Sequence, residues 1–350
     1  MTITAKPLSL AAREASMKRW DSVAKPLASL GRFEQMISDI AAVQETADVS
    51  LTPRCVLVFC GDHGVVRRNI SQSRSDVTLR VARAVAGGSS NINRMAATAS
   101  ADVFAIDMGM AEALDLPDMI MCRHGNGTQD ISVGPAMTKV QAESAIQDGI
   151  ALIGQMHAHG YRLIATGEMG IGNTTSSAAL ACAFLNLPVE SAAGRGAGLS
   201  DAGLERKKAV IREALSVNKP QPDDPVSCLA KFGGFEIAGM TGAFLGGAMY
   251  GIPIIIDGVI SAIAALIAAR ICPDARAFML PSHMGREPIA RRLMDALDLH
   301  PVIYGDMALG EGTGAVMLFP LLDMALSVYN SSHTFKQLGM EAYKPLGGRS

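Results

Sequence analysis

The stretch from Tyr161 to Leu185 combines residue types and spacing that suit phosphate binding. A short apolar run at 163–165 predicts a buried strand, three glycines follow within residues 167–172, and an Ala-rich run after them predicts a helix. A strand, a glycine loop and a helix start together present backbone N–H groups and a helix dipole to an anion. Asn173 or Thr174 is placed to cap that helix, and either side chain could donate a hydrogen bond to a phosphate. An ordinary tight turn between a strand and a helix has the same pattern, so the loop alone leaves both interpretations open.

Two glutamates lie among glycines and could do chemistry. Glu168 lies inside the phosphate-type loop, where a carboxylate would repel a phosphate, so we expect it to contact a hydroxylated part of a ligand such as a ribose. Glu311 lies between two glycines in the apolar stretch LGEGTGAVMLF. A partly desolvated carboxylate has a raised pKa and can act as a base near neutral pH, and glycine neighbours let a flat ligand approach the backbone. The alternative is a glutamate that only stabilises a helix N-terminus.

Further polar residues follow other apolar runs. Cys55–Cys60 predicts a buried strand that leads directly into Gly61-Asp62-His63-Gly64, where Asp62 and His63 could be catalytic or could stabilise a turn. Predicted strands alternate with predicted helices, which indicates an α/β fold with a mainly parallel, Rossmann-like sheet covered on both faces. Such sheets bind ligands at the carboxyl ends of their strands. The polar residues expected there are Asp62, His63, Asp107, Glu168, Asp257, Ser282 and His283.

The elements expected around these residues follow from periodicity and capping signals. Residues 66–75 and 111–135 predict loops, and the polar tail from Asn330 predicts loose packing. Strands are expected at 55–60, 102–106, 163–165, 253–256 and 277–280. Helices are expected at 8–45 with a break at Lys25-Pro26, at 76–86 with Asp76 as cap, at 90–97, at 138–159, after Ser200, at 235–250, 259–270 and 287–297, and from 315 to Tyr329.

The composition excludes several classes of protein. The chain has 350 residues, 49% of them hydrophobic, with a net charge of −2 and 5% aromatic residues, so nothing indicates binding to nucleic acid. Six scattered cysteines without a CxxC pair and an N-terminus without a signal-peptide core predict a cytoplasmic protein. Asp257, Gly258 and Arg270 interrupt the apolar stretch 252–271, which therefore predicts a buried strand and helix rather than a membrane span.

Common nucleotide and metal motifs are missing. The sequence contains no GxxxxGK[ST] phosphate loop, no GxGxxG after the first strand and no GxSxG elbow. His157 and His159 are two positions apart on a predicted helix and face different ways, so they do not form a metal pair. We expect no metal ion and no cofactor.

Segments spread over nearly the whole chain together resemble the nicotinate-nucleotide–dimethylbenzimidazole phosphoribosyltransferase family of cobalamin lower-ligand biosynthesis. None of these segments is decisive alone, but they occur in family order. They are KPLASLGRFE at 25–34, CGDHGV at 60–65, GPAMT at 134–138, GEMGIGNTT at 167–175, KFGGFEIAGMTG at 231–242, PIIIDG at 253–258, PSH at 281–283 and LGEGTGA at 309–315.

The resemblance implies a fold, a reaction and a set of site residues. It implies a large Rossmann-like catalytic domain at 51–315, a smaller helical domain formed by 1–50 and 316–350, and a homodimer. The reaction implied is transfer of phosphoribose from nicotinate mononucleotide to a benzimidazole-type base, with release of nicotinate. The family's catalytic glutamate corresponds to Glu311. Donor ribose and phosphate contacts correspond to Glu168, Gly170, Asn173, Thr174 and Lys207, although Lys208 is adjacent. Acceptor-pocket candidates are Asp62, His63, Ser73, Val81, Ser282, His283 and Leu309.

The chain departs from the family pattern where the acceptor pocket is expected. Residues 67–81 lack the usual Pro and Gln: Arg74 follows Ser73, and Arg80 and Val81 lie near the position of the Gln. Residues 124–131 and 284–287 are also atypical. Three interpretations follow: a benzimidazole acceptor, a phenolic or purine acceptor with the same donor, and a non-catalytic partner subunit. The presence of both Glu311 and Glu168 argues against a non-catalytic subunit.

Overall fold

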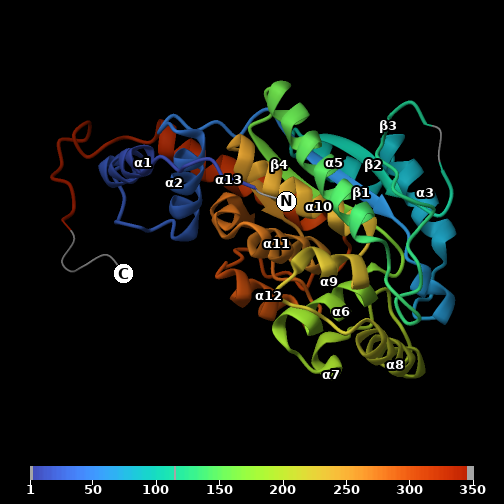
Figure 1. Cartoon of the computed structure of the whole chain (residues 1–350). Helices are drawn as coiled ribbons and strands as arrows, with labels where there is room; N and C mark the ends of the chain where they lie inside the picture. The colour runs from blue at the N-terminus through green and yellow to red at the C-terminus, as the bar shows by residue number, and fades with distance from the viewer. Residues whose placement is uncertain (1–2, 114–115, 345–350) are drawn as a thin grey trace.

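The computed structural model describes residues 3–113 and 116–344, and it is built around one six-stranded sheet (Figure 1). The strand order is β3-β2-β1-β4-β5-β6, and every ladder between described strands is parallel. The strands are β1 (Arg54–Gly61), β2 (Asp102–Gly109), β3 (Met119–Met121), β4 (Leu163–Met169), β5 (Ile254–Ile256) and β6 (Met279–Pro281). The strand order reverses between β1 and β4, which is where a crevice forms in doubly wound sheets. The predicted α/β, Rossmann-like fold is confirmed.

The sheet is buried on both faces because its strands carry apolar residues at successive positions. In β1, Leu57 and Phe59 point into one hydrophobic cluster, whereas Val56 and Val58 point into the other. The cluster around Leu57 includes residues of α5 (Lys139–Ala158), α6 (Asn173–Leu185), α9 (Pro225–Phe232), α10 (Phe235–Tyr250) and α11 (Val259–Ile271). The opposite cluster includes residues of α2 (Arg32–Gln44), α3 (Ser75–Ala86), α4 (Asn91–Thr98) and α13 (Thr313–Ser331). The helices are therefore layered on both faces of the sheet.

The two ends of the chain meet beside the sheet. In Figure 1, α1 (Leu10–Ser22) and α2 lie at one end of the molecule together with the C-terminal segment. Thr334 pairs with Val23 in an antiparallel bridge, and Phe335 is buried. The expectation that the tail packs loosely from Asn330 is therefore wrong for these residues, because an aromatic side chain docks beside the end of α1. The division into domains at residues 50 and 315 remains a prediction.

Several expected boundaries need correction. The cap of α6 is Gly172 with φ of 101°, not Asn173 or Thr174, so both side chains are free to contact other groups. Asp76 lies in the first turn of α3, whose cap is Arg74. The structure adds elements that periodicity missed because they are short or start at a proline: β3, α7 (Val189–Ala192), α9 and two 3-10 segments, Gly64–Arg68 and Pro273–Phe278. The remaining helices are α8 (Asp201–Asn218) and α12 (Ala290–Leu297), the latter starting three residues later than expected.

Two apolar stretches bear on membranes. The stretch 252–271 folds as β5, a turn and α11, as predicted. Within the described residues, α13 is long and apolar enough to cross a membrane by length and composition, and half of its apolar window is buried inside the protein. Its residues Val316 and Phe319 belong to the hydrophobic cluster against the sheet, so the buried face of α13 is part of the protein core.

Candidate active site

A cavity of about 180 Å³ opens at the carboxyl ends of β4, β5 and β6. The loop after β4, the N-termini of α6 and α11, and the segment 307–310 surround it. It brings together Glu168, Gly170, Asn173, Thr174, His283 and Leu309 of the residues expected from the sequence. Of the seven strand-end residues expected from the sequence, Glu168, Asp257 and His283 line this cavity, and its role as the active site stays a prediction.

The phosphate-type loop forms one wall of the cavity. Gly172 takes a left-handed conformation and directs the chain into α6, whose first residues Asn173 and Thr174 face the cavity. The Asn173 side-chain amide donates a hydrogen bond to Glu168 Oε2. The start of a helix at a cavity wall places the positive end of its dipole there, which favours an anion.

Lys207 supplies a cationic group beside this helix start. Lys207 is only 1% exposed, and its Nζ donates a hydrogen bond of 2.8 Å to Thr174 Oγ1. Burial lowers the pKa of Lys207 to about 8, while the nearby Glu287 opposes that shift. At neutral pH most of the lysine is still protonated, so it contributes a positive charge directly behind the loop.

Glu168 lies at the end of β4 among other carboxylates. Burial raises its pKa to about 8, Asp257, Glu236 and Glu311 add to that rise by repulsion, and the hydrogen bond from Asn173 opposes it. At neutral pH this carboxyl is therefore largely protonated and can donate as well as accept a hydrogen bond. Such a group suits a sugar hydroxyl.

Glu311 is held in an unusual backbone conformation. Its φ is 60°, and the flanking Gly310 and Gly312 have φ of 86° and 89°. Glu311 is 7% exposed, and its Oε2 accepts a long hydrogen bond of 3.4 Å from the backbone N–H of Ile92 in the first turn of α4. A non-glycine residue with positive φ is strained and persists where the surroundings fix it, which is common at functional sites. The carboxylate is thus aimed at a helix start beside the cavity wall formed by Leu309 and Gly310.

The Asp257 carboxylate stabilises this turn by accepting two backbone hydrogen bonds. Its Oδ2 accepts a hydrogen bond of 3.2 Å from Gly312 N, and its Oδ1 accepts one of 3.0 Å from Ala315 N. Asp257 therefore satisfies orphan N–H groups at the start of α13 and lines the cavity as well. The sequence identified it as a strand-end carboxylate but did not include it among the site residues.

Ser282 and His283 differ in their access to the cavity. The Ser282 hydroxyl donates to the Ile256 carbonyl at 2.6 Å and lies 3.1 Å from His283 Nδ1. His283 lines the cavity and its Nδ1 is 4.0 Å from Asp257 Oδ1. Ser282 therefore orients the imidazole and does not itself face the cavity.

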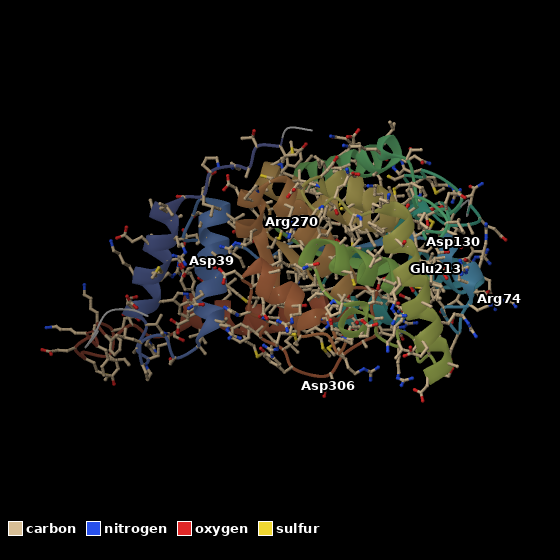
Figure 2. The ribbon with its side chains drawn as sticks, turned by 60° about the horizontal axis from the view of Figure 1, so that its bottom comes forward. Asp39, Arg74, Asp130, Glu213, Arg270 and Asp306 are labelled. Atoms are coloured by element: carbon tan, nitrogen blue, oxygen red, sulfur yellow. The ribbon has the colours of Figure 1, made fainter. Side chains whose placement is uncertain are left out.

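Other expected acceptor residues lie elsewhere. Asp62 and His63 line a second cavity of about 680 Å³, together with Arg67 and Arg74. The two cavities are separate. In Figure 2, Arg74 of the second cavity lies well apart from Asp306, whose neighbour Met307 lines the first cavity. Burial raises the pKa of Asp62, while a hydrogen bond from Ala111 N opposes that rise. These two cavities do not include Ser73, Val81, Ser282, Lys207 or Glu311 among their described lining residues.

Three further residues at the site had weaker signals in the sequence. Gly196, in the glycine-rich connection at 194–198, packs closely against Thr174. A Cβ at residue 196 would be only 3.1 Å from Thr174 Oγ1. Glu287 and Thr313 also line the first cavity. Among the described residues, no group of three or more His, Cys, Asp or Glu side chains is arranged to hold a metal ion. The absence of a metal requirement stays a prediction.

Comparisons with known proteins agree with one another. A family model described as phosphoribosyltransferase matches residues 5–340. The nicotinate-nucleotide–dimethylbenzimidazole phosphoribosyltransferase of Ruminiclostridium cellulolyticum is 40% identical over 341 residues, covering 97% of each chain. The enzyme of that name from Acetivibrio thermocellus is 40% identical over 328 residues, covering 94% of this chain and 93% of the relative. The crystal structure of CobT from Thermus thermophilus superposes with a TM-score of 0.90 at 35% identity, covering 95% of this chain and 99% of that one.

Proposed function

The chain belongs to the nicotinate-nucleotide–dimethylbenzimidazole phosphoribosyltransferase family, and on that basis we propose how its site carries out phosphoribosyl transfer. The donor is nicotinate mononucleotide, the acceptor is 5,6-dimethylbenzimidazole or a related base, and the products are an α-riboside 5′-phosphate and nicotinate. The relatives carry this activity in their names over nearly the full length of the chain.

The observation that carries the proposal is the buried lysine behind a helix start at a cavity wall. Lys207 Nζ donates a hydrogen bond of 2.8 Å to Thr174 Oγ1 in the first turn of α6, so the charge of the lysine and the dipole of the helix favour an anion at the same cavity wall. We assign the donor phosphate to this wall. Glu168, at the base of the same loop, then receives the ribose hydroxyls, as a largely protonated carboxyl can.

The reacting centre is the ribose C1, which we place between the loop and the turn that carries Glu311. One ring nitrogen of the base attacks C1, the bond from C1 to the nicotinate nitrogen breaks, and the leaving pyridine keeps that electron pair. The other ring nitrogen of the base loses its proton to Glu311. Attack and departure occur on opposite faces of C1, so the configuration inverts. General-base assistance of this kind contributes about 10² to 10⁴ in rate.

Three other features of the family are part of the proposal. We propose that two copies of the chain form a homodimer, that residues 1–50 and 316–350 form a small helical domain beside the catalytic domain, and that the protein acts in the cytoplasm. The burial of Phe335 beside α1 supports an association between the two ends of the chain. No metal ion takes part, because the cationic pyridinium of the donor is already a good leaving group.

The experiment is product formation by the purified protein. Incubation with nicotinate mononucleotide and 5,6-dimethylbenzimidazole should release nicotinate and an α-riboside 5′-phosphate in equal amounts. Adenine and a simple phenol serve as competing acceptors, and the product distribution identifies the preferred one. Product formation only with a phenol or with adenine would show that this compound, and not the benzimidazole, is the acceptor. No product with any acceptor would contradict the proposed activity.

A further inference from the structure

A chain of three buried polar side chains packs against the loop 167–172, and none of the three lines the first cavity. The hydroxyl of Ser176 is 2.8 Å from His63 Nδ1, and His63 Nε2 is 2.7 Å from Glu236 Oε1. The side chains of His63 and Glu236 are 0% exposed, and Ser176 is equally buried. The three residues come from the segment just after β1, the first turn of α6 and the first turn of α10. No step of the proposed reaction uses them.

The direction of these hydrogen bonds follows from the chemistry of the groups. An ionised glutamate only accepts hydrogen bonds, so Nε2 of His63 carries a proton and donates to Glu236. In the neutral imidazole, Nδ1 then accepts from the Ser176 hydroxyl. Glu236 lies in the first turn of α10, where the helix dipole favours a negative charge. The chain therefore fixes the His63 ring at both nitrogens.

The His63–Glu236 pair forms the floor of the phosphate loop. A Cβ on Gly172, the cap of α6, would be 3.0 Å from His63 Cβ. A Cβ on Gly170 would be 3.4 Å from Glu236 Oε1. The loop backbone thus packs against these two side chains, and also against the Gly61 carbonyl and Val66. The motifs GDHG and KFGGFE, which the reaction leaves without a role, supply these two residues.

We infer that Ser176, His63 and Glu236 are positioning residues that hold the phosphate loop in its binding geometry. This inference rests on the proposed function for its assignment of the loop to the donor phosphate. His63 then acts through the loop and not on the acceptor, although it follows the same strand end as Asp62. Preorganised N–H groups bind an anion more tightly because less ordering is needed on binding.

The chain offers a matched control for this inference. Ser177, the next residue of α6, is also fully buried, and its hydroxyl has no hydrogen-bond partner among the described residues. Ser176→Ala and Ser177→Ala therefore remove the same atom from the same helix, but only the first breaks the chain to His63. A general loosening of α6 would affect both variants alike.

Two readouts decide the outcome. In Ser176→Ala, amide hydrogen exchange in a peptide spanning 169–176 should be faster than in Ser177→Ala. The KM for nicotinate mononucleotide should rise roughly twofold to tenfold, the range a buried hydrogen bond supplies, with kcat and the acceptor KM within about twofold of wild type. Equal exchange in the two variants, or equal shifts of donor and acceptor KM, would overturn the inference.

The exchange comparison does not require turnover, so it separates this inference from the proposed function. If the wild-type protein forms no product, the proposed function fails, and exchange with and without inorganic phosphate still tests the positioning role. His63→Asn serves as a second variant if Ser176→Ala unfolds early in a thermal melt. It keeps an amide near the Nδ1 position but loses the contact with Glu236, so exchange in the same peptide should again be faster than in Ser177→Ala. Unchanged exchange in a folded His63→Asn protein would also overturn the inference.

Discussion

The backbone of Glu311 rests directly on Gly167 of β4. A Cβ at residue 167 would collide with the Glu311 carbonyl oxygen and lie 2.9 Å from Gly312 N. Only glycine at this position lets the strained turn 310–312 sit on the end of the sheet. The position of the proposed base therefore depends on a residue of a neighbouring strand that does not itself react.

This contact predicts that Gly167→Ala displaces Glu311. The added methyl group must push the turn away, and overpacking of this kind destabilises a protein by about 1–3 kcal/mol. We expect kcat to fall together with stability, while Gly134→Ala, where nothing lies within 4 Å, changes neither appreciably. Thermal unfolding measures the stability of both variants, and steady-state kinetics measures their kcat. A fully active Gly167→Ala protein would mean that the exact placement of this turn does not matter.

A charge at Asn173 should weaken donor binding. Asn173 donates its amide to Glu168 and lies in the first turn of α6 at the cavity wall. Asn173→Asp replaces that donor with a carboxylate, whose negative charge repels the donor phosphate. Juxtaposed like charges cost several kcal/mol, so the dissociation constant for nicotinate mononucleotide should rise by about tenfold or more.

Asn186→Asp is the matched control for this variant. It makes the same substitution at the opposite end of α6, where Asn186 is the C-terminal cap. Calorimetric titration of both variants separates the local charge from a general effect on the helix. Equal donor affinity in folded Asn173→Asp and Asn186→Asp proteins would remove this loop from the donor site.

Donor affinity should fall as the pH rises through about 8. Burial lowers the pKa of Lys207 to about 8 and raises the pKa of Glu168 to about 8. Above that pH the lysine loses its positive charge and the glutamate gains a negative one, so both changes disfavour the phosphate. The phosphate itself is already a dianion, since its second pKa is about 6. The titrating groups of the protein therefore determine how steeply donor affinity falls with pH.

The Glu168→Gln variant tests the origin of that slope. Glutamine cannot ionise, so the decline of donor affinity between about pH 7 and pH 9 should be shallower than in the wild type, whatever the affinity at pH 7. Titrations at several pH values in one buffer system provide the measurement. Parallel profiles for the two proteins would show that Glu168 does not titrate in this range.

The sequence predicted the fold well because strands β1, β4 and β5 are continuous apolar runs followed by glycine or carboxylate. It also placed Glu168, Gly170, Asn173, Thr174 and His283 around one cavity, since carboxyl ends of parallel strands share one edge. The capping roles were harder to predict. Gly172 caps α6 through its φ of 101°, which spacing alone does not reveal.

Long-range side-chain contacts could not be predicted from spacing. His63 follows the same strand end as Asp62, yet its ring bonds Ser176 and Glu236, which are more than a hundred residues away in the sequence. Asp257 stabilises the turn after Glu311 through backbone groups of residues 312 and 315. Such partners depend on the packing of α6, α10 and α13 on the sheet, and no local pattern specifies them.

The most direct test of the proposed mechanism compares wild-type protein with Glu311→Gln under saturating donor. The wild type should convert nicotinate mononucleotide and 5,6-dimethylbenzimidazole to nicotinate and an α-riboside 5′-phosphate, with the anomeric configuration read by NMR. Glu311→Gln should bind the donor as the wild type does but form product about 10² to 10⁴ times more slowly, because it lacks the proton acceptor. A folded Glu311→Gln protein that turns over within a few-fold of wild type, or a β-configured product, would contradict the mechanism.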